Sequence, residues 1–403
     1  MVCTVAPGSS ADYVILEQAE YHLGGREPTG RWYAPGADLG LADGQEIDNA
    51  VFRQVHEGVD PRTGEQIGKP NAAGERVAGY DAQFAAPKSV SILWALADDA
   101  TRAKIEACQE RAVRAALDFC QQAGAQIRTG HNGVTIEKVR IFGATFQHGE
   151  SRPTERADGL HRSDPQLHTH TIIMNLGQGA DGKWRALDGR PLMALQKAMG
   201  AQYHAELARL LETELGTKIE RKNLDEARHN GEFELAGIDP GLIEQFSTRR
   251  STIAAETERH GVTTREAAEL AGEITLATRQ GKSDETREEQ LARWAEEAAE
   301  AGHTWQSIQS AALGQHIDQA AQQERANAYE ESVAQAIDRL TETESVFSQA
   351  DLYAALAQAG AGRGVGAADV IAIERDLIAS GQLVALAKDE TGKAIHSTRD
   401  LIT

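Results

Sequence analysis

Three kinds of segment are missing from this 403-residue sequence, and each absence narrows the class of protein. No run of about 18 apolar residues occurs, so no membrane-spanning segment is predicted. The opening stretch, MVCTVAPGSSADY, lacks the basic region and continuous apolar core of a secretory signal. No glycine-rich loop of the form GxxxxGKS or GxxxxGKT is present, so nucleotide hydrolysis is not predicted.

Cysteine and positive charge are both scarce. The three cysteines, Cys3, Cys108 and Cys120, are scattered, which predicts a reducing compartment and neither a disulfide framework nor a zinc ribbon. The net charge of −20 argues against a generic nucleic-acid coat protein. Residues 101–200 nevertheless hold 14 Lys and Arg against 10 Asp and Glu, whereas residues 251–350 hold 8 against 19. A phosphate-binding site in the middle of the chain therefore remains open.

The middle of the chain alternates helical and extended patterns. Residues 101–123 and 191–215 read as two long helices, the first with apolar residues 3 or 4 apart and the second ended by Gly216. The extended runs between them turn at residues 131–133 and 180–182, which predicts hairpins. We therefore expect an α+β fold in which an antiparallel sheet carries its helices on one face.

Changes in composition along the chain predict three parts. Residues 1–238 form a core, whose first 75 residues, rich in Gly, Asp and Pro, read as strands and loops with little helix. A short helix is expected to begin near Lys88, in APKSVSILWALADD. Residues 239–325 read as a helical extension, and residues 326–403 as a small winged-helix-like module.

The stretch LHTHTII, residues 167–173, has the clearest chemical meaning. Side chains alternate along a strand, so His168 and His170 share one face and Thr169 points to the other. Two imidazoles on one face are part of a metal site, and a catalytic metal usually takes three protein ligands. The alternative is a pair of histidines at the edge of the core with no metal.

The candidates for the third ligand include His22, His131, His148 and His161, and two of them are favoured. His148 ends the extended run RIFGATFQH, and a neighbouring strand would place it beside the pair, whereas His161 lies in a polar loop and is the second choice. Asp81, in GYDAQFAAPKSV, is our candidate for a carboxylate that orients a ligand histidine, the alternative being an ordinary turn aspartate. Three imidazoles suit Zn, Mn, Ni, Cu or a tolerant Mg site.

Several segments together resemble one known family. PQLHTH, FQHGESR and DAQFAAPKSVSILWAL look like parts of the relaxase domain of MobF-type (TrwC-like) conjugative relaxases. SADYVILEQAEYHLGGREPTGRW is similar to the opening of that domain, and GEFELAGIDPGLIEQFSTRR and ESVFSQADLYAAL are similar to later parts. The resemblance covers nearly the whole chain in family order.

The resemblance implies an HUH endonuclease-like palm that nicks one DNA strand at a plasmid origin of transfer and transfers that strand. A 5′-phosphotyrosine intermediate would carry the strand. Tyr13 matches the leading nucleophile and Tyr21 the tyrosine of the second cluster. The metal triad falls on His148, His168 and His170, and Asp81 matches the supporting carboxylate.

The resemblance also implies cofactors and partners. One divalent ion is expected, Mg or Mn in use, with Zn, Ni or Cu as other candidates. The partners would be single-stranded origin DNA with an adjacent hairpin, and conjugation accessory and coupling proteins. We expect a monomer in the bacterial cytoplasm, with residues 239–325 clamping DNA. Many members continue into a helicase, so residues 326–403 would begin that region.

The sequence departs from the family in two places. Each tyrosine cluster holds one tyrosine where a doublet is common, because Val14 and His22 occupy the partner positions. The loop before the histidine strand is longer, by roughly PTERADGLHR, which keeps His161 open as a ligand.

Basic residues on or beside the predicted hairpins and at the helical extension are expected to bind DNA phosphates. For any one of them, balancing a neighbouring carboxylate is the alternative role. The set comprises Lys88, Arg128, Lys138, Arg140, Arg152, Lys183, Arg185, Arg249 and Arg250.

Three other classes compete with this interpretation. A rolling-circle replication initiator shares the metal chemistry, but its tyrosine normally follows the histidine pair, whereas the candidates here precede it. A metal-dependent hydrolase would want additional Asp or Glu ligands and no covalent tyrosine. A DNA-binding adaptor would act through the winged-helix-like module alone.

Overall fold

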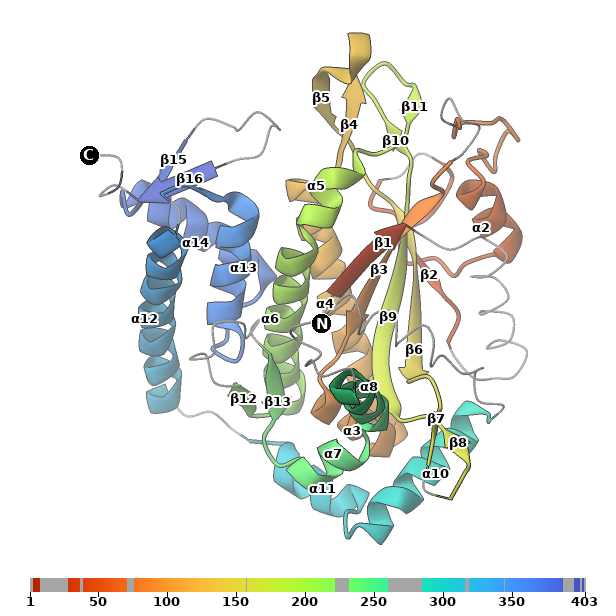
Figure 1. Ribbon diagram of the computed structural model, residues 1–403, viewed down its shortest axis with the longest axis vertical. Helices are drawn as coiled ribbons and strands as arrows, with labels where there is room; N and C mark the ends of the chain where they lie inside the picture. Colours follow the sequence, from red (N-terminus) through yellow and green to blue (C-terminus); the bar gives the residue numbers. More distant parts are fainter. Residues whose placement is uncertain are drawn as a thin grey trace.

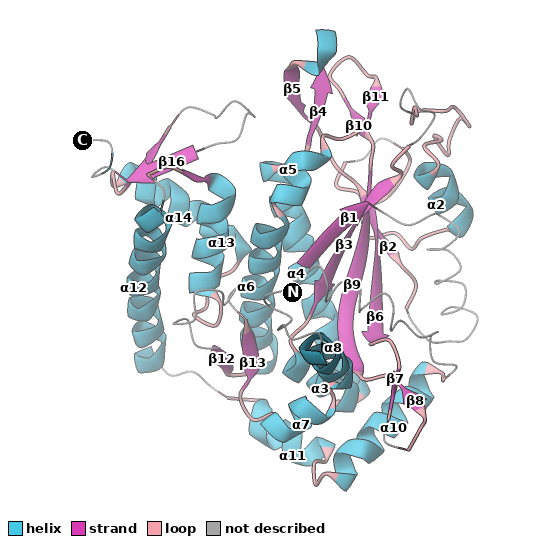
Figure 2. Ribbon diagram, in the orientation of Figure 1, coloured by secondary structure: helices cyan, strands magenta, loops and turns pink. Residues whose placement is uncertain are grey.

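The computed structural model describes residues 3–7, 28–36, 39–70, 76–156, 158–221, 232–259, 285–315, 319–343, 345–386, 395–398 and 401. At its centre, described strands form an antiparallel sheet in the order β1–β3–β9–β6–β2 (Figures 1 and 2). These strands are β1 (Cys3–Pro7), β2 (Arg31–Tyr33), β3 (Gly79–Ala85), β6 (Gly143–Glu150) and β9 (Pro165–Met174). This antiparallel sheet confirms the predicted fold class.

Small hairpins project from the central sheet. Two of them stand at the top of Figure 1 and confirm the predicted turns at residues 131–133 and 180–182. The first hairpin is shorter than expected, because β5 stops and the following run, β6, crosses into the central sheet. The small strands are β4 (Gln126–Thr129), β5 (Thr135–Lys138), β7 (Thr154–Glu155), β8 (His161–Arg162), β10 (Gly177–Gln178), β11 (Trp184–Arg185), β12 (Ile219–Arg221) and β13 (Phe233–Leu235).

Two long helices, α4 (Asp99–Ala123) and α6 (Gln196–Leu215), cover one face of the sheet. The apolar spacing predicted α4, whereas the single helix predicted over residues 191–215 is divided into α5 (Gly189–Ala194) and α6. The Asp98 side chain caps α4 by accepting the Thr101 N–H at 2.8 Å. Gly216 ends α6 with a φ of +61°, a left-handed conformation that glycine adopts without a Cβ clash. Alternate residues of β3 and β9, including Phe84 and Ile173, pack into this core.

A short helix, α2 (Asn49–His56), packs on part of the opposite face. Its Phe52 and Val55 are fully buried in a second apolar cluster with Phe146 of β6 and Ile172 of β9. The expectation of little helix in the first 75 residues therefore missed α2, and helices are not confined to one face. The part of this face that carries the histidines of β9 holds the candidate site.

The remaining helices lie below and beside the sheet. Of these, α10 packs against α3 under the sheet, and Trp94 and Trp294 meet there with ring centroids 6.2 Å apart. The helices are α3 (Lys88–Leu96), α5 (Gly189–Ala194), α7 (Pro240–Gln245), α8 (Thr248–Arg259), α10 (Arg287–Glu300), α11 (Trp305–Ala312), α12 (Gln319–Thr343), α13 (Gln349–Gly360) and α14 (Ala367–Ala379). Within the described ranges, no helix has the length and apolar content needed to cross a bilayer.

The C-terminal part follows α12 with β14 (Phe347–Ser348), α13, α14, β15 (Leu383–Ala385) and β16 (Ile395–Thr398). The three strands form a small sheet in the order β14–β16–β15. The winged-helix-like module stays a prediction. Of the two predicted boundaries, residue 239 is the N-cap of α7, whereas residue 326 falls inside α12. Since α13 also packs along α6, this part is joined to the core by side-chain packing.

Gly149 marks the place where β6 and β9 change register. His148 pairs with His168, but Glu150 pairs with Pro165, so β9 has one more residue in this interval than β6. A Cβ atom on Gly149 would lie 2.2 Å from Cη2 of Trp94, which is itself almost fully buried. No other residue type fits here without displacing Trp94 or the end of β6.

We expect Gly149→Ala to lower the free energy of unfolding by about 1–3 kcal/mol, because overpacking a dense core forces neighbours to move. Urea denaturation of both proteins measures the difference. In a double-mutant cycle with Trp94→Leu, the two losses should be less than additive, because the smaller side chain removes the clash. Strict additivity would contradict this explanation.

Candidate metal centre and DNA-binding surface

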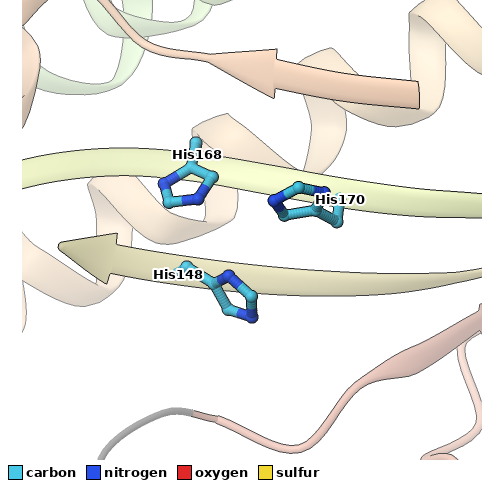
Figure 3. Close-up of side chains that lie close together, drawn as sticks. All are labelled: His148, His168 and His170. Atoms are coloured by element: carbon cyan, nitrogen blue, oxygen red, sulfur yellow. The ribbon is translucent and has the colours of Figure 1, made fainter. Parts of the chain in front are cut away.

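Three histidines meet on one face of the central sheet. His148 of β6 lies directly opposite His168 of β9 in the strand register, and His170 is two residues further along β9. Their ring centroids are 5.2–5.4 Å apart, and one ligand atom from each lies within 4.8 Å of the others (Figure 3). The structure thus brings together the three side chains that the sequence proposed as a triad.

Two of the rings are oriented by acceptors behind them. The Nδ1 atom of His168 lies 2.7 Å from the Gln166 carbonyl oxygen, and Nδ1 of His170 lies 2.9 and 3.0 Å from the two Asp81 carboxylate oxygens. Since a carbonyl and a carboxylate only accept, Nδ1 carries the proton in both neutral rings. The Nε2 lone pairs are then available to a cation, the usual arrangement behind ligand histidines.

The cluster is partly open to solvent. His148 and His168 are 8% and 7% exposed, whereas the His170 side chain is 25% exposed and Asp81 27%. Three nitrogen donors with one accessible side fit a metal that keeps positions open for a substrate. This donor set suits a borderline divalent transition metal and does not select one ion.

The other candidate ligand lies elsewhere. His161 is an exposed residue of the small strand β8, where it pairs with Glu155, and it does not belong to the histidine cluster. The inserted loop therefore forms part of the β7–β8 hairpin. The two candidate nucleophiles, Tyr13 and Tyr21, lie outside the described residues, as do Val14 and His22.

Lys88, Arg249 and Arg250 line one cavity of about 610 Å³ together with Ser151 and Gln166. Burial lowers the pKa of Lys88 to about 8, and its Nζ donates to the Pro165 carbonyl oxygen at 2.7 Å. Gln166 is also the residue whose carbonyl contacts His168, so this cavity adjoins the histidine cluster. Arg152 lies between β6 and β7, at the same end of the sheet.

The other predicted DNA-binding residues lie around the hairpins at the opposite end of the sheet (Figure 1). Their side chains are largely held by other groups: Arg128 pairs with Asp188, Arg185 pairs with Asp181, Lys138 donates to Ala123, and Arg140 donates to Gly36. Lys183 is exposed. The nine candidates thus form two groups instead of one continuous groove.

A second cavity, of about 520 Å³, opens between these hairpins. Lys138 and Arg140 line it beside Phe142 and Trp184, whose rings meet edge to face at 6.1 Å. Cationic and aromatic side chains in one recess are the combination that binds phosphates and bases.

Sequence reasoning missed the group that positions Arg249 and Arg250. Asp164, only 1% exposed, accepts from Arg156 at 2.5 Å and from the backbone N–H of Thr248 at 2.9 Å. Thr248 opens α8, so this carboxylate fixes the helix start beside β9. The 84 residues between Asp164 and Thr248 leave no local pattern that could reveal the contact.

Comparisons with known proteins agree with this geometry. The sequence model of the TrwC relaxase family matches residues 7–301. The multifunctional conjugation protein TraI of Escherichia coli is 27% identical over 363 residues, which cover 86% of this chain and 19% of TraI. The chain therefore spans about a fifth of the length of that relative.

Solved structures of the conjugative relaxase TrwC are also similar. A metal-bound complex of TrwC with oriT DNA superposes with a TM-score of 0.63 and 29% identity, covering 75% of this chain and 99% of that chain. A complex of TrwC with a 27-mer DNA, comprising the recognition hairpin and the cleavage site, shares 29% identity with the same coverage and a TM-score of 0.61.

Each of the single variants His148→Ala, His168→Ala and His170→Ala should lose most of its affinity for Mn²⁺, because three nitrogen donors share one ion. Titration calorimetry on the purified variants measures the loss. Asp81→Ala should weaken binding by about ten- to a hundredfold without abolishing it, since it only orients His170.

His161→Ala is the matched control and should bind as the wild type does. A variant lacking His161 that loses the metal, together with a His148→Ala variant that keeps it, would mean that the β7–β8 hairpin supplies the third ligand.

Proposed function

This chain belongs to the TrwC relaxase family, and from that premise we propose that it nicks one DNA strand at an origin of transfer and transfers it during conjugation. The observation that carries the proposal is the cluster of His148, His168 and His170 on an open sheet face, oriented by Gln166 and Asp81. The solved TrwC complexes hold oriT DNA, and one of them is described as metal-bound.

The three histidines would hold one divalent ion, Mg or Mn in use, with Zn, Ni or Cu as alternatives. When bound, such an ion polarises a phosphodiester and offsets the charge that gathers on its oxygens. Asp81 contributes by holding His170 in one tautomer, since both of its oxygens already face Nδ1 of that ring.

Tyr13 is our nucleophile, and Tyr21 would serve a second transfer. A phenol has a pKa of about 10, so its proton must leave as the oxygen attacks. The Tyr13 oxygen would form a bond to the scissile phosphorus, and the bond from phosphorus to the 3′ oxygen would break. The 3′ oxygen then takes up a proton, and the 5′ phosphate stays on tyrosine as an ester whose bond energy is kept for rejoining.

The two basic groups suggest two DNA contacts. The cavity of Lys88, Arg249 and Arg250 adjoins the histidines and would hold phosphates of the single strand near the cleaved bond. Lys138, Arg140 and Trp184, at the far hairpins, would hold the adjacent DNA hairpin. Residues 239–325 would clamp the strand through α8, with most of their acidic side chains facing solvent.

Further partners follow from the proposed reaction. We propose that the protein acts as a monomer in the bacterial cytoplasm, where plasmid DNA is found, together with accessory and coupling proteins of conjugation.

Three alternative classes are less well supported. A metal-dependent hydrolase would want carboxylate ligands, but among the described residues the histidine cluster includes none, and Asp81 contacts a ring nitrogen. A DNA-binding adaptor acting through α14 would need a basic helix, yet its exposed side chains include Asp369 and Asp376 beside Arg375. A rolling-circle initiator shares the chemistry and is separated by the order of tyrosine and histidines.

Tyr13→Phe should abolish the covalent protein–DNA adduct while leaving metal and DNA binding nearly unchanged, because only the nucleophilic oxygen is lost. The test incubates each protein with single-stranded origin DNA and Mn²⁺, then resolves adducts on a denaturing gel. Tyr21→Phe is the matched control and should still form the first adduct. An adduct mapped by mass spectrometry to Tyr21 alone would overturn the assignment.

Binding of single-stranded DNA should depend steeply on salt. Four to six phosphate contacts predict a slope of log K against log[salt] of roughly −3 to −4, at about −0.7 per contact. The double variant Arg249→Ala/Arg250→Ala should reduce the slope by about 1.4 if both side chains contact phosphate. Fluorescence anisotropy titrations between low and physiological salt measure these slopes.

Arg375→Ala, which removes an exposed arginine of α14, is the control and should leave the slope unchanged. A wild-type slope near zero would mean that neither basic group contacts DNA phosphates.

A further inference from the structure

A chain of polar side chains is buried behind the histidine strand. Gln109 of α4 and Tyr203 of α6 are both 0% exposed, and Thr169 of β9 is 4% exposed. They lie in the main core, between the sheet and its two long helices, where most neighbouring side chains are apolar. Thr169 separates His168 from His170 and points to the opposite face of the sheet.

Hydrogen bonds join these side chains in series, and each donor lies on the side away from β9. The Tyr203 hydroxyl donates to Oε1 of Gln109 at 2.6 Å. Nε2 of Gln109 donates to Oγ1 of Thr169 at 3.1 Å and to the Phe84 carbonyl oxygen at 3.4 Å. Phe84 lies directly opposite Thr169 in the β3–β9 register, so one amide links both strands to both helices.

The chain of bonds is difficult to explain by stability alone. A buried hydrogen bond contributes little net free energy, and replacing both partners by apolar groups of the same shape is often nearly neutral. Its distinct effect is geometric, because a slip of one residue would turn both histidines of β9 into the core. A hydrogen bond to Thr169 holds that side chain toward the helices and the histidines on the open face.

Thr171, the next residue of β9 on the same face, provides a contrast. It is 0% exposed, and its hydroxyl makes no hydrogen bond to any described residue. The two threonines share a strand, a face and their burial, and each adjoins His170. They differ in their connection to Gln109.

We propose that Gln109, Tyr203 and Thr169 are positioning residues of the metal centre, which fix His168 and His170 from behind through the Thr169 hydroxyl. This inference rests on the metal-binding role proposed above for the histidines. None of the three side chains belongs to the histidine cluster itself.

The test compares Thr169→Val with Thr171→Val in the full chain, because each change replaces a hydroxyl by a methyl group of the same size. Co²⁺ serves as the probe, and its visible absorption reports the ligand geometry while calorimetry gives the affinity. The ¹⁵N shifts of the imidazoles, recorded without metal, report the tautomer and hydrogen bonding of His168 and His170.

Thr169→Val should weaken Co²⁺ binding about tenfold, as loss of supporting hydrogen bonds does at other metal sites, and should alter the Co²⁺ absorption and both ring shifts. Thr171→Val should leave all three unchanged, and Thr169→Ser should restore them. Tyr203→Phe should also weaken Co²⁺ binding and alter the absorption and ring shifts. If Thr169→Val does not fold, Tyr203→Phe is measured in its place.

If Thr169→Val leaves the Co²⁺ affinity and the imidazole ¹⁵N shifts unchanged, the proposal is overturned. The buried hydrogen bonds would then have a structural role only. An equal loss in Thr171→Val would overturn it too. Wild-type protein that binds no divalent ion would contradict the metal role of the triad, and the ring shifts of the metal-free variants would then decide the positioning role separately.

Discussion

The pairing of β6 with β9 is the constraint on which the candidate site depends. It places His148 opposite His168, and the pairing of β9 with β3 on its other side brings Asp81 to the ring of His170. Three segments from distant parts of the chain thus meet in one register. Because strand side chains alternate, a slip of one residue in either pair would send a ligand to the wrong face. Gly149, where the register changes, lets β6 approach Trp94 closely enough to continue this pairing as far as Glu150.

The two faces of the sheet have different roles in the structure. One face is buried under α4 and α6, and Thr169 on that face accepts a hydrogen bond from Gln109 of α4. Part of the other face is open and carries the imidazoles. The helical extension supports this division from below, since Gln290 of α10 donates to the Glu150 carboxylate at 2.6 Å, at the end of β6. A site whose ligands lie on rigid strands supported from behind keeps its geometry better than one built on loops.

Local patterns in the sequence were enough to predict much of this arrangement. Apolar spacing predicted α4, Gly216 marked the end of α6, and alternation along β9 put His168 and His170 on one face. The position of His148 at the end of an extended run was sufficient to choose it over His161. Asp81 was chosen from its place in the run GYDAQFAAPKSV, with a turn aspartate as the alternative, and the family resemblance then favoured it. The sequence alone could not decide between the two, because Asp81 lies 89 positions from His170. Contacts such as Asp164 with Thr248 and Gln109 with Thr169 depend on how the elements pack, and no spacing within a segment records them. The short helix α2 was missed because it is only eight residues long and follows a stretch rich in Gly and Asp, although four of its residues are apolar. A helix this short depends on packing against the sheet.

Because the protein is acidic, its basic residues would bind DNA phosphates under conditions that differ from those in most DNA-binding proteins. Two of the hairpin cations already have a carboxylate partner. Arg128 pairs with Asp188, and Arg185 pairs with Asp181, whose pKa the guanidinium holds well below its usual range. A DNA phosphate at such a cation must compete with that carboxylate, which lowers the gain from each contact. With a net charge of −20, diffuse attraction to any nucleic acid is also weak. Binding would then require several cations to be engaged together, at Arg249 and Arg250 beside the histidines and at the distant hairpins. On the proposal made above, such a protein would discriminate by the shape of its DNA, because only a strand whose adjacent hairpin reaches the far end of the sheet would engage both groups.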